Sequence, residues 1–396
     1  MRVWLNVILV LMSAAGVRAQ DTAREPRHAA DASGPAWTWT PDANVFFGFN
    51  FQDRRFNNFT AWESQNWFML AGRRPLGRGH LTVQGMISLE PFTMKALGSP
   101  QVFQTGESYH HSAIIDYQHP HDLLMHLGAT YRAERGRLAY VVGADLVGSP
   151  ALGPDVFMHR ESARDNPQAP LIHHHLDATH ITPGVLRAGI DIDRVSLEGS
   201  WFRGEEPDDK RLNLGRPRLD SWSARAGWRS GPWQAHVSGG HLQQPEWFDP
   251  YDVVRLTASI GFTGAIGSRP LAATIAWGEN REPPAILDGY LLEWDLRATG
   301  ATSLYGRAEL AAKDIFNLGV PESTIEHGHR ISRVGALTLG CLRDVSTRTW
   351  GRVGIGADAT VYRTSSDLRL LYGAPHSFHV FIRYRPNPRA SEGHVH

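Results

Sequence analysis

Histidine is concentrated in one part of this sequence. Half of the 20 histidines lie between residues 110 and 180. Imidazole nitrogens beside carboxylates are ligands for Zn, Cu, Ni or Fe(II), and nothing in the pattern selects one of these metals. In an extended chain, residues two apart project to the same side at a spacing of about 6.5 to 7 Å. His119 and His121 could therefore face one ion, as could His173 and His175. The candidate metal ligands are His110, His111, His119, His121, Asp122, His173, His174, His175 and Asp177.

Two other interpretations of these histidines stay open. Imidazole changes its charge near neutral pH, so the cluster is also a candidate proton-sensitive site. Alternatively, the histidines are solvated or pack within loops and bind no ion.

A nucleophilic site is a weaker hypothesis. Ser108 and Ser112 lie near His110, His111 and Asp116, which are the residue types for base-activated attack, although such residues are common in polar loops. The sequence contains no G-x-S-x-G, H-E-x-x-H, C-x-x-C or P-loop motif. No catalytic residue is therefore assigned.

The elements that must position these residues are strands. From Asn44 to Arg385, segments of about ten residues alternate apolar and polar side chains, as strands with one apolar face do. In one such segment, Val254, Leu256, Ala258, Ile260 and Phe262 share one face, while Arg255, Thr257, Ser259 and Gly261 share the other.

The breaks between these segments alternate between short and long. Short turns are expected near 135–136, 191–193, 230–232, 264–268, 299–301 and 344–347, and long loops at 90–121, 148–178, 204–217, 313–329 and 362–372. Short turns on one rim and long loops on the other are typical of outer-membrane barrels. The sequence predicts an all-β fold: a closed antiparallel transmembrane β-barrel of about 16 strands, within a range of about 14 to 18, with short periplasmic turns and long extracellular loops.

The strand number decides which face points inward. About eight strands leave an interior that side chains can fill, whereas about sixteen leave a water-filled lumen, so the polar face must point inward. Tryptophans on the apolar face near strand ends, such as Trp201 and Trp222, are expected to form aromatic girdles. The residues expected to line the pore are Glu198, Arg225, His236, Arg255, Glu293, Asp295, Arg297, Arg307, Glu309, Arg352, Asp358 and Arg383.

The remaining segments and the composition narrow the function classes. Residues 1–19 have the basic start, apolar run and small residues of a cleaved signal peptide, and 20–43 read as a disordered periplasmic lead-in. The barrel is expected to span 44–385 and a C-terminal tail 386–396. With one cysteine, Cys341, no disulfide can form within the chain. Lys+Arg and Asp+Glu both number 40, which gives no electrostatic case for binding nucleic acid.

The signal peptide, the hairpin rhythm and the strand Phe378–Tyr384 resemble bacterial outer-membrane β-barrel proteins, and the strand count is similar to that of porins. In porins the third long loop folds into the lumen. That resemblance implies constriction candidates in the third loop: His159, Arg160, Glu161, Arg164 and Asp165. It also implies assembly by the barrel assembly machinery, although this chain continues past the aromatic Tyr384 that would serve as the terminal signal. Segments 119–122, 157–160 and 163–171 further resemble a group of uncharacterised barrels known mainly from genome sequences, which implies no activity.

The sequence thus predicts a porin-like channel for small hydrophilic solutes in a bacterial outer membrane, with His-rich loops that bind metal or sense pH. Outer-membrane lipid and lipopolysaccharide are the expected surroundings. A transition-metal-binding barrel without channel activity, and a lipid-acting enzyme, are the alternatives.

Overall fold

The computed structural model describes residues 36–110, 112–246, 250–283, 285–319 and 331–387. The long strands of the wall are β1 (Thr38–Arg54), β2 (Asn57–Glu63), β3 (Asn66–Leu76), β4 (Gly79–Ile87), β9 (Leu124–Arg135), β10 (Leu138–Gly148), β11 (Thr182–Ile192), β12 (Val195–Phe202), β13 (Ser221–Ser230), β14 (Trp233–Leu242), β15 (Val253–Ile266), β16 (Arg269–Glu282), β17 (Ala285–Arg297), β18 (Thr302–Asp314), β19 (Ile331–Arg348), β20 (Gly351–Thr364) and β21 (His376–Arg385).

Short elements lie in the connections between these strands. They are β5 (Ser99–Pro100), β6 (Ser108–Tyr109), β7 (Ser112–Ala113), β8 (Tyr117–Gln118), α2 (Glu90–Thr93), the 3-10 turn η1 (Phe157–His159), α3 (His173–Leu176) and α4 (Ser366–Tyr372). No helix in the described ranges is long and apolar enough to cross a bilayer.

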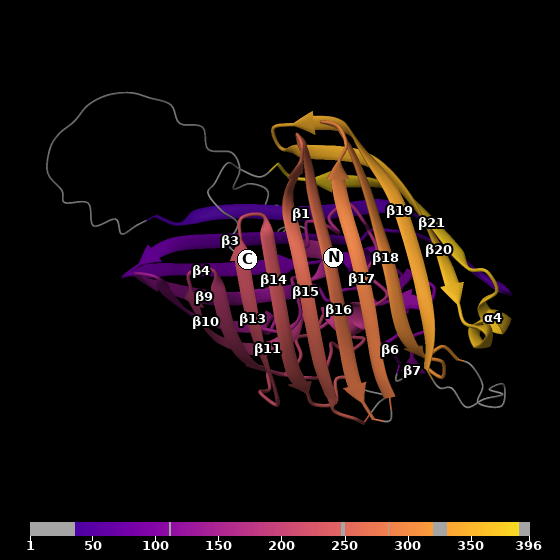
Figure 1. The fold of residues 1–396 in the computed structure, drawn as a ribbon, viewed down its shortest axis with the longest axis horizontal. Helices are drawn as coiled ribbons and strands as arrows, with labels where there is room; N and C mark the ends of the chain where they lie inside the picture. The colour runs from indigo at the N-terminus through magenta and orange to yellow at the C-terminus, as the bar shows by residue number, and fades with distance from the viewer. Residues whose placement is uncertain (1–35, 111, 247–249, 284, 320–330, 388–396) are drawn as a thin grey trace, which may run out of the picture. The chain divides into compact units, whose positions relative to one another are not determined.

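The wall strands form one closed antiparallel sheet (Figure 1). Each strand pairs with its sequence neighbour, and β1 pairs with β21 to close the ring. Both β2 and β3 pair with β1, along its second and first halves, so they form one wall strand interrupted at 64–65. The result is a closed barrel of 16 strands, which confirms the predicted fold class. Because the ring has no free edge, the backbone of every wall strand has a partner on each side.

Short turns and long loops lie at opposite rims. Breaks at 77–78, 136–137, 193–194, 231–232, 267–268, 298–301 and 349–350 form the short-turn rim. Most breaks at the other rim are longer: 88–123, 149–181, 203–220, 243–252, 315–330 and 365–375. The turn expected near 344–347 was placed too early, because β19 continues to Arg348 through a bulge between Asp344 and Ser346. The first strand begins at Thr38, before the expected Asn44.

Alternation along the strands separates an apolar outside from a polar inside. In β17, the outward-facing Tyr290 and Leu292 are 49% and 46% exposed, whereas the inward-facing Glu293 is 1% exposed. The same pattern leaves large apolar side chains exposed around the wall, including Ile260, Leu339 and Ile382. Such a belt is suited to contact with lipid hydrocarbon.

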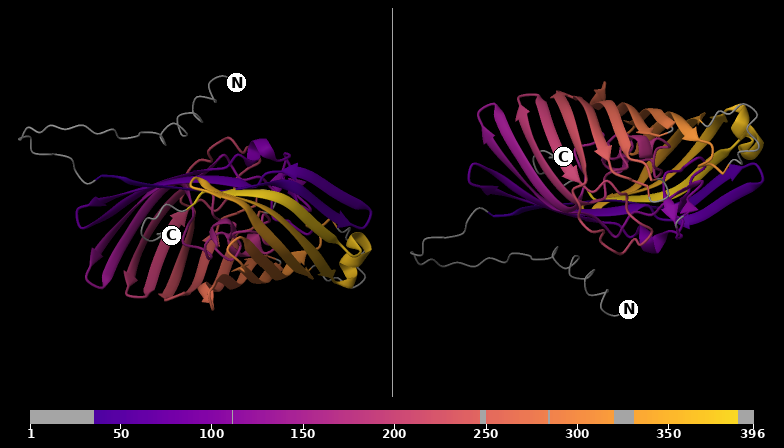
Figure 2. Two further views of the ribbon diagram at one scale, coloured as in Figure 1. Left: turned by 90° about the horizontal axis from the view of Figure 1, so that it is seen from above. Right: turned by 90° about the horizontal axis from the view of Figure 1, so that it is seen from below.

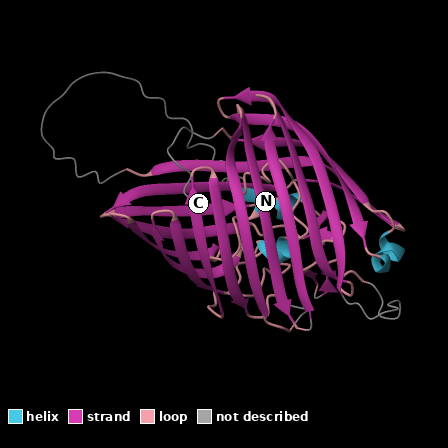
Figure 3. Cartoon of the chain, in the orientation of Figure 1, coloured by secondary structure: helices cyan, strands magenta, loops and turns pink. Residues whose placement is uncertain are grey.

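Two long loops fold into the barrel rather than away from it. Figures 2 and 3 show chain and short helices inside the ring of strands. Leu171, Ile172 and Leu176 of loop 149–181 are at most 1% exposed and share an apolar cluster with wall residues. Val102 and Phe103 of loop 88–123 belong to the same cluster and are fully buried. The two loops therefore build a packed core inside the lumen.

Close approach of α3 to the wall depends on two glycines. Gly278 of β16 and Gly289 of β17 are directly paired in the sheet. A methyl group added at Gly278 would overlap the carbonyl oxygen of His175, and one added at Gly289 would overlap the side chain of Ile172. The absence of side chains at this point of the wall lets the helix backbone lie against it.

Candidate functional site

The lumen contains buried ion pairs that join loop 149–181 to the wall. The guanidinium of Arg160 contacts Glu293 at 2.7 Å and also pairs with Asp177 of the same loop. Arg307 of β18 reaches the other oxygen of Glu293 at 3.1 Å. All four side chains are at most 3% exposed. Burial would raise the pKa of Asp177, but Arg160 and His173 outweigh it and hold that pKa below its ordinary value. Asp177 is therefore a carboxylate that balances a buried cation.

A second set of ion pairs fixes the middle of the same loop. Asp165 pairs with Arg383 of β21, and Arg383 also contacts Asp344 at 3.2 Å. Arg164 contacts Asp295 at 3.3 Å and Glu161 at 2.7 Å. Arg225 of β13 also donates to the carbonyl of Gly153 in this loop, and β13 lies on the opposite side of the ring from β21, so the loop is anchored on more than one side of the lumen.

Wall side chains also bind the loop backbone. Lys313 donates to the carbonyl of Leu171 at 3.0 Å, and Arg307 donates to that of Gln168 at 2.8 Å. Asn280 donates to the carbonyl of His174 at 3.1 Å. These donors satisfy carbonyls that would otherwise be buried without partners.

The residues expected to line a pore lie at inward positions of the strands, but the side chains of many of them are buried. Those that are at most 9% exposed are Arg255, Glu293, Asp295, Arg307, Glu309, Asp358 and Arg383. The partly exposed ones are Glu198, Arg225, His236, Arg297 and Arg352. Arg225 pairs with Glu198 at 2.7 Å and donates to the carbonyl of Gly153. Of the constriction candidates, Arg160, Arg164 and Asp165 make the ion pairs above, Glu161 contacts Arg164 and Arg385, and His159 packs against the ring of Trp67 at 4.7 Å.

The histidines gather inside the barrel, but not in the expected pairs. The segment 173–175 is helical in α3, so His173 and His175 do not project to the same side, and the prediction based on an extended chain was wrong there. His119 and His121 have ring centroids 6.3 Å apart and different carboxylate partners, Glu107 and Glu90. That pair therefore does not face one ion either.

The other candidate ligands have partners of their own. His173 contacts Asp177 at 2.7 Å, and the rings of His173 and His180 are 5.3 Å apart. Asp122 contacts Arg211 at 3.3 Å. The backbone of His110 donates to Asp209, near the surface, and His111 lies outside the described residues.

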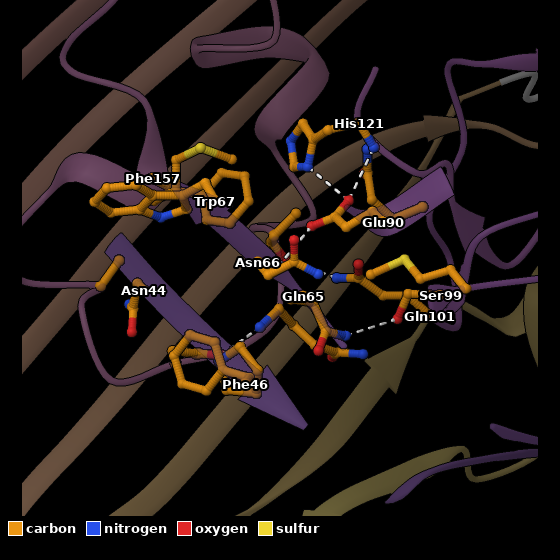
Figure 4. Close-up of a pocket in the computed structure, with 18 of the residues that line it drawn as sticks. Asn44, Phe46, Gln65, Asn66, Trp67, Glu90, Ser99, Gln101, His121 and Phe157 are labelled. Atoms are coloured by element: carbon orange, nitrogen blue, oxygen red, sulfur yellow. Dashed lines mark hydrogen bonds and ion pairs between the residues drawn. The ribbon is translucent and has the colours of Figure 1, made fainter. Parts of the chain in front are cut away.

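A small cavity lies beside the histidines, between loops and wall. It has a volume of about 40 Å³ and is lined by Asn44, Phe46, Trp67, His121 and Phe157 among others. Figure 4 shows His121 and Glu90 pointing toward one another at its edge, where they are 2.8 Å apart. A space of this size holds about one or two water molecules, so it is not a binding site for a sugar or a lipid chain.

Sequence reasoning missed two carboxylates at the centre of the histidine cluster. Within the described ranges, the group of side chains whose ligand atoms lie close enough for one ion is Glu107, His174 and Glu206, with these atoms within 4.8 Å of one another. Glu206 was missed because its loop, 203–220, is far in the sequence from the histidine-rich loops. Glu107 was missed because no repeat or spacing in the sequence marks it.

The serine hypothesis finds no geometric support. Asp116, its expected acid, contacts Arg54 at 2.9 Å and accepts hydrogen bonds from the backbone of Phe103 and the hydroxyl of Tyr372. Ser108 and Ser112 lie in the small β6–β7 hairpin. The described contacts of Asp116 therefore place it in the packing between loop and wall.

Comparisons with known proteins concern the fold. No protein-family model matches the sequence, and no curated protein is significantly similar to it. The structure is similar to the anion-selective porin from Comamonas acidovorans, with a TM-score of 0.52 and 10% identity over 88% of this chain and 100% of the porin. It is also similar to the outer-membrane channel DcaP of Acinetobacter baumannii, with a TM-score of 0.50 and 9% identity over 90% of this chain and 99% of that channel. The chain therefore has the barrel fold of bacterial outer-membrane porins.

Proposed function

We propose that this protein is a bacterial outer-membrane channel for small hydrophilic solutes in which loops 88–123 and 149–181 form the barrier to passage. The porin fold and the exposed apolar belt support a location in the outer membrane, surrounded by lipid and lipopolysaccharide. Export through a cleaved signal peptide and insertion by the barrel assembly machinery belong to the same proposal.

The main support for a barrier is that loop 149–181 is anchored across the lumen. An open porin has water against its inward charges, but here Glu293, Arg307 and Arg383 are 1% to 3% exposed. Each of these charges is paired with a loop residue or with a neighbour on the wall. Because breaking a buried pair leaves a charge uncompensated, at a cost of about 3 to 5 kcal/mol, we expect the loop to remain docked most of the time.

The paired charges also suggest what the channel selects. Cations and anions of the lumen neutralise one another in pairs such as Arg225 with Glu198 and Arg160 with Asp177. Little net field remains to favour one sign of ion. We expect at most a weak anion preference, and reversal potentials that show firm cation selectivity would contradict this.

Planar-bilayer recording of the refolded mature protein tests the proposal. We expect conductance steps well below those of an unobstructed sixteen-stranded pore, and larger or more frequent openings for Arg160→Ala. The matched control is Arg137→Ala, which removes an exposed ion pair with Asp193 at the short-turn rim and should leave the recording unchanged. Full porin conductance by the unaltered protein would refute the barrier, and no conductance by either the protein or Arg160→Ala would refute the channel.

A further inference from the structure

Four polar side chains from three loops converge inside the barrel. Glu107 and His119 come from loop 88–123, His174 from loop 149–181 and Glu206 from loop 203–220. Glu107, His119 and His174 are 4% to 8% exposed, and the Glu206 side chain is 10% exposed. The ligand atoms of Glu107, His174 and Glu206 lie within 4.8 Å of one another. A carboxylate–imidazole group at such spacing has the donor types of a transition-metal site.

His174 has no hydrogen-bond partner for either ring nitrogen, although its side chain is 93% buried. Its Nε2 lies 3.3 Å from Glu107 Oε1, and its Nδ1 lies 3.7 Å from Glu206 Oε2. Glu206 Oε1 is also buried without a hydrogen-bond partner. Buried polar atoms are nearly always paired, so these orphaned atoms point to a missing partner between the three side chains.

His119 orients Glu107 within this group. Its Nδ1 lies 2.7 Å from the carbonyl oxygen of Pro120. A carbonyl oxygen only accepts, so Nδ1 carries the proton and the neutral ring presents the lone pair of Nε2. That lone pair faces Glu107 Oε1 in close contact. Two acceptors in such close contact need a proton between them, so His119 holds the Glu107 carboxyl in position as a hydrogen-bond partner rather than as a metal ligand.

Two buried carboxylates lie close together in this cluster, and a cation between them would offset their mutual repulsion. Burial raises the pKa of Glu107, and the nearby charge of Glu206 raises it further. Burial likewise raises the pKa of Glu206 to about 7, against the opposing effects of Arg255 and Arg211. Burial lowers the pKa of His174 well below its ordinary value, so its imidazole is neutral and can donate a lone pair.

We propose that Glu107, His174 and Glu206 bind one divalent transition-metal ion of the zinc class, with His119 holding the Glu107 carboxyl in position. One imidazole nitrogen and two carboxylate oxygens make a three-ligand set, which leaves the fourth position of a tetrahedral Zn²⁺ site for water. With bonds of about 2.1 Å, ligand atoms in such a site lie about 3.4 Å apart, close to the 3.3 Å between His174 Nε2 and Glu107 Oε1. The ion ties together three loops that meet in the lumen, and the binding itself does not depend on whether the barrel conducts.

Equilibrium dialysis of the chelator-treated, refolded protein against Zn²⁺ tests the site. We expect one tight equivalent that His174→Ala removes and that Glu107→Gln or Glu206→Gln weakens at least tenfold. The matched control is His241→Ala, which removes another histidine paired with a carboxylate, Asp252, at 3.3 Å. It should leave the tight equivalent intact. Retained heat-modifiable gel mobility shows that each variant has folded.

Co²⁺ provides a second readout that depends on geometry. We expect the bound Co²⁺ to show the strong visible absorption of a tetrahedral site, and His119→Ala to reduce it. The proposal is overturned if no stoichiometric Zn²⁺ binds, or if the tight equivalent survives in the combined Glu107→Gln, His174→Ala variant. Zinc binding by a barrel that never conducts would reject the channel and keep the metal site, and conductance without zinc binding would do the reverse.

Discussion

The paired glycines beneath α3 allow a sharp test of loop docking, through the substitution Gly278→Ala. The added Cβ would lie closer to the carbonyl oxygen of His175 than the 3.0 Å that real contacts respect. Hydrogen bonds to β15 and β17 hold Gly278 on both sides, so α3 is the part that must move. Overpacking of this kind costs about 1 to 3 kcal/mol, which raises the undocked population of loop 149–181 about 5- to 150-fold.

Tryptic cleavage after Arg160 and Arg164, followed by mass spectrometry, reports that population, because cleavage tracks the open form when opening is fast. The control is Gly300→Ala in a short turn, where an added Cβ would meet nothing within 4 Å. Alanine within a strand is otherwise favourable relative to glycine, so a loss of docking has the opposite sign from the intrinsic effect. Equal cleavage rates in Gly278→Ala and the unaltered protein would refute the close packing of α3 on the wall.

Three further predictions concern the same interior. Phe103→Ala removes a fully buried ring stacked on Tyr372 at 4.2 Å, and should weaken docking of loop 88–123 by about 3 to 5 kcal/mol, seen as faster hydrogen exchange in that loop. Glu293→Gln leaves Arg160 with one fewer carboxylate and should speed tryptic cleavage of loop 149–181, whereas unchanged cleavage would show that this ion pair contributes nothing to docking. Burial, together with His173 and His121, lowers the pKa of His180 well below its ordinary value while Asp177 opposes this, so His180 is neutral when docked and takes up a proton when released. Docking of loop 149–181 should therefore weaken as pH falls below 6.5, by up to about 1.4 kcal/mol per pH unit. Hydrogen exchange in the loop, measured against pH, should show this slope, and His180→Gln should reduce it. An unchanged slope in the variant would contradict the assignment.

The wall could be predicted from the sequence because its pattern is local. In β15 and β17, most side chains point to the side that their polarity indicates, so alternation alone separates Arg255 and Glu293 from Ile260 and Tyr290. The number of strands follows from counting these segments. Strand ends were less predictable, because a bulge in β19 adds residues that alternation does not reveal.

The interior could not be predicted in the same way, because it depends on contacts between residues far apart in the sequence. Arg160 and Glu293 are separated by 133 positions, and no local pattern pairs them. The short helix α3 was also missed, because four residues are too few to show a helical repeat. The sequence did contain one signal. Gly278, Gly289 and Leu291 lie on the polar face of their strands, where the wall of a water-filled lumen would be expected to carry polar side chains. Such small or apolar inward residues mark the place where a loop packs on the wall.

The most direct test of the filled lumen is the water accessibility of an inward wall position beneath the loops. Ala311 of β18 is fully buried and belongs to the apolar cluster with Ile172 and Leu176. In a Cys341→Ser background, we expect Ala311→Cys to resist a small water-soluble maleimide in the folded barrel, while Ser196→Cys, at a partly exposed position of β12, is labelled. Labelling of both cysteines at similar rates would show that water fills the barrel and would contradict the account.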